Sequence, residues 1–306
     1  MSAGSGSRAI IAALAANAGI AVAKFIGYLV TGSSSMLAES VHSVADTSNQ
    51  GLLLLGKKRA EREATAEHPF GFGRDRYFYS FVVALLLFSL GAVFSLYEGV
   101  HKIADPHPVE SPLVAIGILA VAIVLESYSF RTAIHESRPL KGNRSWWRFI
   151  RESTQPELPV VLLEDFGALV GLALALVGVG LAMITGNGVW DGLGTVGIGL
   201  LLGAIAVVLI IEMKSLLIGE GAGPTTLRTI TQALEGGRVE RVVHIKTQYL
   251  GPDELLIGAK IAMPPGLRLE DVAQAIDDAE QRIRAAVPEA RIIYLEPDLD
   301  RSQHIS

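Results

Sequence analysis

The sequence contains no cysteine among its 306 residues, and charged residues make up only 19% of it. Without thiolates, neither disulfides nor sulfur ligands are available, so a metal site would have to be built from His, Asp and Glu. The chain also lacks a basic stripe with interleaved aromatic residues, which argues against a nucleic-acid partner. Its start, MSAGSGSRAI, lacks the charged, apolar and small-residue regions of a cleavable signal peptide. We therefore expect the first apolar run to be a permanent membrane span.

Apolar residues are abundant instead: 50% of the chain is hydrophobic and the mean hydropathy is +0.41. This is too apolar for an ordinary soluble protein of this size. A membrane span needs about 20 apolar residues. Six stretches meet this length, at residues 9–31, 36–56, 77–100, 111–131, 158–184 and 190–218. The sequence therefore predicts a polytopic α-helical membrane protein with a six-helix transmembrane domain over residues 1–218.

The basic residues favour one orientation of these spans. Six Lys and Arg residues lie in the loop at 57–76 and six at 131–151, whereas the loops on the other side contain only Lys102. By the positive-inside rule, both termini are expected in the cytoplasm, which in a bacterium would place the protein in the inner membrane. The segment RSWWRFIRE, residues 144–152, combines Trp with basic residues and is typical of an interfacial anchor before the fifth span.

After Gly219 the pattern changes to that of a soluble domain over residues 219–306. Two segments, beginning near Leu227 and Leu269, repeat apolar residues with the helical period. The strand-like segments VVHIKTQYL and LLIGAKIAM are joined by the turn GPDE, and RIIYLE comes after the second helical segment. This order predicts an α-β-β-α-β unit, a two-layer α+β fold with its helices on one sheet face.

Ionisable residues inside the predicted spans need a reason, since a charge near the bilayer centre costs roughly 2.5–3.5 kcal/mol. His42 and Asp46 are four residues apart in the second span, so on a helix they point about 40° from one another. The fifth span contains Glu164 and Asp165, and either could supply the next ligand. One imidazole with two or three carboxylates suits Zn²⁺ and tolerates Co²⁺, Fe²⁺, Mn²⁺ or Cd²⁺.

These ligands also bind protons, so metal and H⁺ compete for one site. A site that opens alternately to each side would exchange divalent metal ions for protons across the bilayer. Glu39 lies three residues before His42 on the same helix face, where it could orient the imidazole. Apart from the transported ion, no cofactor is expected.

The other charged residues of the spans have simpler explanations. Glu98 and Glu126, and Glu39 if it is taken alone, can each form only a helix-packing hydrogen bond. Lys24, Glu212 and Lys214 have long side chains that can snorkel towards the interface. A membrane enzyme is disfavoured, because the sequence has neither an HExxH motif nor a nucleophile paired with a base. The alternative to a transporter is a metal-sensing or scaffolding membrane protein that does not transport.

Five segments match, in order, the pattern of the cation diffusion facilitators, also called the zinc transporter family: TGSSSMLAESVHSVADTSNQ, HPFGFGRDRYFYS, SLYEGVHKI, VLLEDFGALVG and YLGPDELLIGAKI. The resemblance extends from about residue 10 to residue 298. It implies a six-helix membrane domain, a cytoplasmic ferredoxin-like domain and a homodimer. It also implies export of divalent metal from the cytoplasm in exchange for protons.

The resemblance assigns His42 and Asp46 as the two ligands on the second helix and Asp165 as a ligand on the fifth. In the family, the fourth ligand usually stands four residues before that Asp, where this chain has Val161. We expect Glu164 to replace it, since the Glu-Asp pair resembles one branch of the family. The departure leaves the metal open, with Zn²⁺ favoured over Mn²⁺, Fe²⁺ and Co²⁺.

Two more departures concern peripheral metal sites. Many members read HPxGHGR after helix two, whereas HPFGFGR keeps only His68, so we expect at most a weak site there, with loop packing as the alternative. The soluble domain contains only His244 and His304. A zinc site involving Glu296 or Asp298 is therefore the weaker expectation, and dimerisation without metal is the stronger one.

Overall fold

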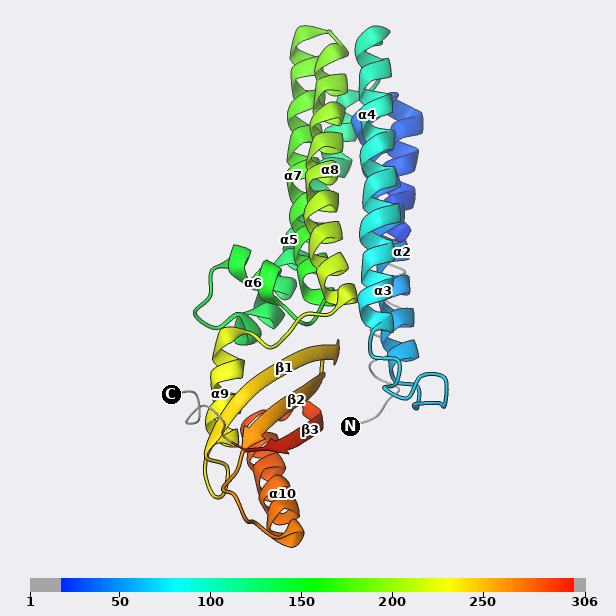
Figure 1. Cartoon of the computed structure of the whole chain (residues 1–306). Coiled ribbons are helices and arrows are strands. Elements are labelled where there is room, and N and C mark those ends of the chain that lie inside the picture. Colours follow the sequence, from blue (N-terminus) through cyan, green and yellow to red (C-terminus); the bar gives the residue numbers. More distant parts are fainter. Residues whose placement is uncertain (1–17, 300–306) are drawn as a thin grey trace, which may run out of the picture. The chain divides into compact units, whose positions relative to one another are not determined.

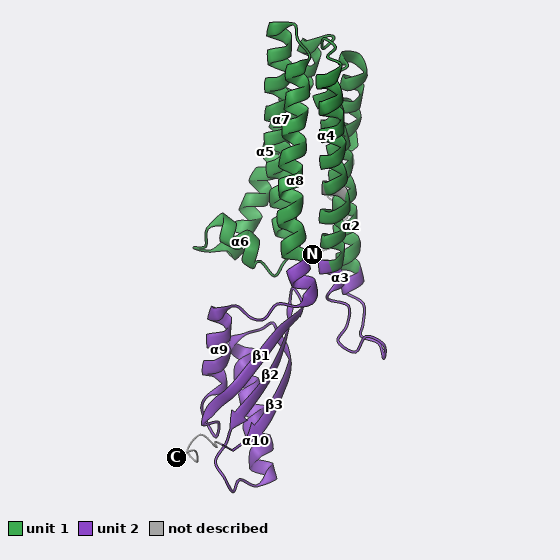
Figure 2. Ribbon diagram, turned by 45° about the horizontal axis from the view of Figure 1, so that its top comes forward, with its two compact units in different colours: residues 1–58, 78–213 green, residues 59–77, 214–306 purple. Residues whose placement is uncertain are grey.

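The structure is a computed structural model that describes residues 18–299. The first nine residues of the predicted first span, 9–17, and His304 lie outside this part. The chain divides into two compact units (Figure 2): a helical unit, residues 1–58 with 78–213, and an α/β unit, residues 59–77 with 214–306. The α/β unit thus includes the loop after the second helix as well as the C-terminal region. The predicted boundary at residue 218 stays a prediction.

The helical unit is built from a helix over Ala18–Thr31 and the elements that follow it, of which Figure 1 labels all but the short η1. These are α2 (Ser34–Ala60), α3 (Asp75–Val82), the π-helical turn η1 (Val83–Phe88), α4 (Ser89–Ala104), α5 (Pro112–Lys141), α6 (Trp146–Glu152), α7 (Glu157–Thr185) and α8 (Val189–Ile218). The α3, η1 and α4 segments form one helical run, Asp75–Ala104. Sequence periodicity did not predict the π-helical turn inside it.

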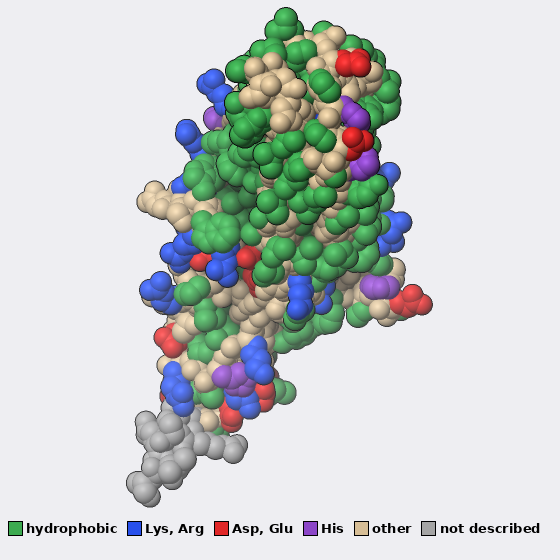
Figure 3. Space-filling view, turned by 90° about the horizontal axis from the view of Figure 1, so that it is seen from above, with side chains coloured by type: hydrophobic (Ala, Val, Ile, Leu, Met, Phe, Trp, Pro, Cys, Tyr) green, Lys and Arg blue, Asp and Glu red, His purple; other side chains and the backbone are tan. Residues whose placement is uncertain are grey.

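Four of the described helices are long and apolar enough to cross a membrane: Asp75–Ala104, α5, α7 and α8. The helix α2 has 27 residues, but its buried side chains include many polar ones, so it does not meet the same apolar standard. The helix at Ala18–Thr31 is apolar but short within the described residues. Hydrophobic side chains cover much of the visible face of the helical unit (Figure 3). Four spans are therefore supported, and six remain a prediction.

Small residues let α4 and α8 approach closely. A Cβ atom added to Gly99 of α4 would lie 2.7 Å from the backbone nitrogen of Val196, and one added to Gly199 would lie 2.8 Å from the Leu96 side chain. Glycine is needed where two helix backbones come this near, a common way of packing helices in lipid. The contact fixes α8, which in turn positions the start of α2.

Asp191, in the first turn of α8, is fully buried and holds the N-terminus of α2. Its carboxylate accepts hydrogen bonds from Ser33 Oγ and the Ser34 backbone N–H, both at 2.8 Å, and from the Ser35 N–H at 3.3 Å. The first backbone N–H groups of a helix have no partner within it. Asp191 therefore caps α2 from another helix. This contact fixes the position of α2, and of its polar residues, along the axis of the helical unit.

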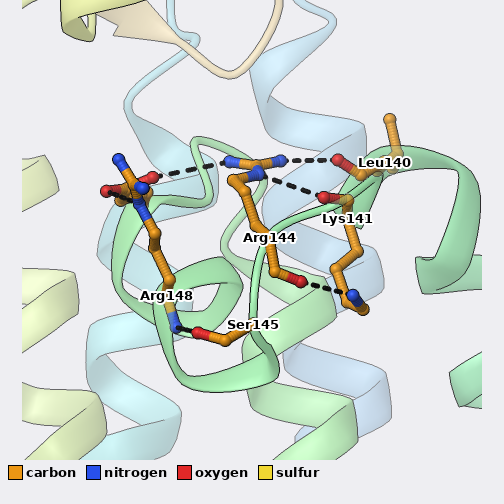
Figure 4. Close-up of polar contacts among 6 residues, drawn as sticks. Leu140, Lys141, Arg144, Ser145 and Arg148 are labelled. Carbon is orange, nitrogen blue, oxygen red and sulfur yellow. Dashed lines mark hydrogen bonds and ion pairs between the residues drawn. The ribbon is translucent and has the colours of Figure 1, made fainter.

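Basic side chains hold the connection from α5 to α6 through hydrogen bonds (Figure 4). Arg144 Nε donates to the Lys141 carbonyl at 3.2 Å, which satisfies one of the carbonyls at the C-terminal end of α5. Ser145 caps α6 by accepting a hydrogen bond from the Arg148 N–H at 3.2 Å. Arg151 of α6 donates to the carboxylate of Glu212 on α8 at 3.1 Å. Glu212 is thus buried and paired with a residue of the predicted interfacial segment, and its snorkelling stays a prediction.

The α/β unit confirms the predicted order α-β-β-α-β. It contains α9 (Pro224–Leu234), β1 (Arg241–Gly251), β2 (Glu254–Ala262), α10 (Leu269–Ala286) and β3 (Ala290–Asp298). The sheet order is β1-β2-β3, with β1 antiparallel and β3 parallel to β2. Alternate residues of β2, from Leu255 to Ile261, are buried in one core with residues of α9 and α10. The ferredoxin-like assignment of this unit stays a prediction.

Candidate metal transport site

His42 and Asp46 lie one turn apart on α2, and both are buried. The His42 Nδ1 and Asp46 Oδ1 atoms are 3.5 Å apart. The same helix also buries Ser43 and Asn49, so α2 presents a polar face to the inside of the helical unit rather than to lipid. The predicted spacing therefore places both groups within reach of one ion.

Glu164 and Asp165 are both buried on α7. Ser129 of α5 donates to Asp165, with its Oγ 3.2 Å from Oδ1 and 3.1 Å from Oδ2. A hydrogen bond with Asn49 of α2 engages Glu164. Adjacent helical residues differ by about 100° in direction, yet both acids stay inside because α2 and α5 meet α7 here. Three helices thus supply polar groups at one level.

A small cavity lies between these groups. Its volume is about 10 Å³, close to the space that admits one water molecule. It is lined by Ile20, Ser43, Asp46, Gln50, Glu126, Ser129, Glu164 and Asp165. Three of the four predicted ligands therefore share one ion-sized cavity. The fourth, His42, lies one turn along α2 from Asp46 and does not line the cavity.

Three buried atoms of this site have no hydrogen-bond partner: His42 Nε2, Asp46 Oδ1 and Glu164 Oε2. A buried polar atom without a partner costs about 1–3 kcal/mol. A cation that receives these lone pairs would offset that cost. Within residues 18–299, no group of three or more His, Asp or Glu side chains is arranged to hold a metal ion as it stands. Side-chain rotation is therefore needed to bring the ligands around an ion.

Lys24, on the first helix, is a functional candidate that sequence reasoning missed. It is fully buried, and its Nζ donates to Glu39 Oε2 at 3.0 Å and to Ser43 Oγ at 2.8 Å. The prediction that Lys24 snorkels is wrong, because an internal carboxylate pairs with it. Glu39 is likewise fully buried, and its contact is with Lys24. Its predicted role in orienting His42 stays a prediction.

Glu126 and Ser129 of α5 were also missed as members of the site. The prediction gave Glu126 only a packing role, whereas in the structure it lines the same cavity as Asp46 and Asp165. The available signal was their spacing: residues three apart on a helix share a face. An acid and a hydroxyl on one face of an apolar span could have been grouped from the sequence.

The predicted peripheral sites have other contacts. The exposed His68 ring lies 4.6 Å from the Phe72 ring, between centroids, and the Arg62 guanidinium lies 3.9 Å from the same Phe72 ring. In the α/β unit, Lys260 Nζ lies 2.9 Å from Glu296 Oε1 and 3.4 Å from Asp298 Oδ2. The hydrogen bond with Glu296 raises the pKa of Lys260. The two acids proposed for a zinc site thus bind a lysine, and both peripheral metal sites stay predictions.

Known proteins are similar in sequence to the helical region of this chain and to part of its C-terminal region. Residues 10–218 match the cation efflux transmembrane domain. The human proton-coupled zinc antiporter SLC30A9, mitochondrial, is 37% identical over 242 residues, which is 78% of this chain but 42% of the relative. The chain thus spans less than half the length of that relative. Metal tolerance protein C4 of Arabidopsis thaliana is 29% identical, over 83% of this chain and 56% of the relative.

Magnetosome protein MamB of Paramagnetospirillum magneticum is 27% identical over 270 residues, covering 87% of this chain and 85% of the relative. The family match extends over more than two thirds of the chain and coincides with its apolar helices. It confirms the prediction of an integral membrane protein, and the family is one of transporters, not enzymes. The chain therefore belongs to the cation diffusion facilitator family.

Proposed function

We propose that this protein is a divalent metal cation/proton antiporter that exports Zn²⁺, or Mn²⁺, Fe²⁺, Co²⁺ or Cd²⁺, from the cytoplasm by alternating access. The observation that carries the proposal is the ion-sized cavity between helices, lined by Asp46, Glu164 and Asp165. Two of these acids have buried oxygens without a hydrogen-bond partner. Ionisable groups inside a membrane domain are costly and typically mark an ion pathway.

The donor set favours a borderline divalent cation. Carboxylate oxygens alone suit Mg²⁺, Ca²⁺ or Mn²⁺, whereas an imidazole nitrogen adds affinity for Zn²⁺ and its neighbours in the first transition row. His42 is 3.5 Å from Asp46 and has a free Nε2. We assign His42, Asp46 and Asp165 as ligands, with Glu164 as the fourth. The zinc antiporter named among the relatives agrees with Zn²⁺ as the first metal to test.

Proton coupling is a consequence of the chemistry of these ligands. Carboxylates and imidazole must give up protons to bind a metal, so metal binding releases H⁺. After the ion leaves on the far side, the same groups take protons from that side. The return of the protonated site to the cytoplasmic side completes an exchange. The distribution of Lys and Arg favours a cytoplasmic location for both termini. Export from the cytoplasm is the direction that the family resemblance implies.

A reconstituted flux assay tests this proposal. The purified full chain is placed in vesicles that contain a metal-sensitive dye and a pH-sensitive dye. We expect an imposed Zn²⁺ gradient to drive metal movement together with proton movement in the opposite direction. Zinc flux that proceeds without any proton movement would overturn the antiport mechanism. Zinc binding without flux of either ion would instead favour a metal-sensing or scaffolding role.

A further inference from the structure

The α5 helix reaches the cavity as well as α2 and α7. Glu126 and Ser129 of α5 both line it, and α5 packs along α7. Ser129 Oγ lies within 3.2 Å of both carboxylate oxygens of Asp165. Glu126 is therefore at the level of the site and near ligands from two helices.

The unpartnered oxygens point to a ligand that sits among these acids. Asp46 Oδ1 and Glu164 Oε2 belong to residues that are more than nine-tenths buried, and neither atom accepts a hydrogen bond. Both residues line the cavity together with Glu126. The carboxylate of Asp165, in contrast, accepts hydrogen bonds from Ser129. The two unpartnered oxygens of Asp46 and Glu164 can therefore bind a cation.

In the conformation of the structure, α2 and α7 bring three of the four assigned ligands to this cavity. Glu164 and Asp165 point about 100° apart, so both cannot face one ion equally. One turn before Asp165, α7 carries Val161, an apolar residue packed against the hydrophobic core. His42 does not line the cavity. A carboxylate from a third helix can supply a further metal ligand at the cavity.

We propose that Glu126 of α5 is a metal ligand of the transport site, so that the ion is held by groups from three helices: Asp46, Glu126 and Asp165 at the cavity, with Glu164 beside them and His42 joining them when its side chain rotates towards the ion. This inference rests on the proposed function and deepens it. A shell richer in carboxylate oxygen accepts harder ions such as Mn²⁺ as well as Zn²⁺. Ligation from α5 also means that any movement of α5 against α2 would assemble or open the shell.

The test is metal binding by the purified full chain in detergent. Zn²⁺ and Mn²⁺ are titrated separately against a fluorescent chelator that competes for them. We expect Glu126→Gln to weaken both affinities by at least about tenfold, in line with losses seen even for groups that only support ligands. Glu136→Gln, an exposed acid on the same helix, is the matched control and should bind as the wild type does.

A second variant separates ligation from a structural role. Glu126→His replaces an oxygen donor with a nitrogen donor, so it should restore much of the Zn²⁺ affinity but not the Mn²⁺ affinity. With Co²⁺ bound, the visible absorption bands should differ between wild type and Glu126→His, because they report the donor atoms. Identical Co²⁺ spectra in the two proteins would overturn direct ligation by Glu126.

The controls also separate this inference from the proposed function. Unchanged binding in Glu126→Gln, beside lost binding in Asp46→Asn, would overturn the role of Glu126 and leave the transport site in place. Wild-type binding in Asp46→Asn, Asp165→Asn and Glu126→Gln alike would overturn the whole site. Thermal unfolding of each variant shows whether a lost affinity reflects a lost fold.

Discussion

The buried pair of Lys24 and Glu39 should be one of the most sensitive points of the helical unit. Both side chains are fully buried, with Nζ 3.0 Å from Oε2, and Ser43 Oγ accepts a second hydrogen bond from the ammonium at 2.8 Å. The other oxygen of Glu39, Oε1, has no hydrogen-bond partner. Lys24 is therefore the group that compensates the Glu39 charge. We predict that Lys24→Met destabilises the protein strongly.

The expected size comes from leaving one charge of a buried pair alone, which costs about 3–5 kcal/mol. For a unit of this size, 1 kcal/mol shifts Tm by about 2–4 °C, so Tm should fall by roughly 6–20 °C. The double variant Lys24→Met with Glu39→Gln should unfold close to the wild type, since removing both charges of a buried pair is often neutral.

The measurement is thermal unfolding of the detergent-purified wild type, both single variants and the double variant. The four values form a double-mutant cycle that isolates the interaction between the two side chains. A Lys24→Met variant as stable as the wild type, with additive effects in the double variant, would refute the claim that Lys24 compensates Glu39.

Three further predictions concern the α/β unit and its loop. The hydrogen bond from Arg238, at 2.8 Å, lowers the pKa of Asp271 from its usual 3.8. The pair therefore stabilises the fold fully at pH values above 3.8. Asp271→Asn should therefore lower Tm at pH 7, and the difference should vanish as the pH falls through the lowered pKa; a constant difference down to pH 3 would contradict this. We predict that the full chain is a homodimer and that light scattering gives the mass of a dimer even in excess chelator; a monomer that dimerises only with zinc would refute metal-free assembly. Phe72→His should change transport little, because it leaves the loop site near His68 incomplete; a large gain in metal affinity would show that a loop site already exists.

The apolar pattern of the sequence predicts much of the fold because burial in lipid and helix length leave few choices. The predicted spans at 158–184 and 190–218 lie within two residues of α7 and α8. The turn GPDE does join β1 to β2. In contrast, α5 continues to Lys141, ten residues past its predicted end, and passes through Pro139 in its last turns. The apolar pattern contains no signal for that extension.

The site was predicted less completely because it depends on which helices become neighbours. The spacing of His42 and Asp46 fixes their shared face, and the acids of α7 were identified by their burial in an apolar run. The role of Lys24 depends on the first helix lying beside α2, where Glu39 meets it. Glu126 depends in the same way on the contact of α5 with α7. A lone charge in a span gives no indication of its partner until the helices are placed.

The central claim, that the carboxylates of α2 and α7 carry the exchanged ions, is tested most directly by flux in vesicles with both dyes. Asp46→Ala and Asp165→Ala should each abolish zinc flux, whereas Glu136→Ala, an exposed acid on α5, should transport as the wild type does. Glu164→Ala should weaken zinc affinity more than it slows turnover. Full zinc flux in Asp165→Ala with unchanged proton movement would contradict the account.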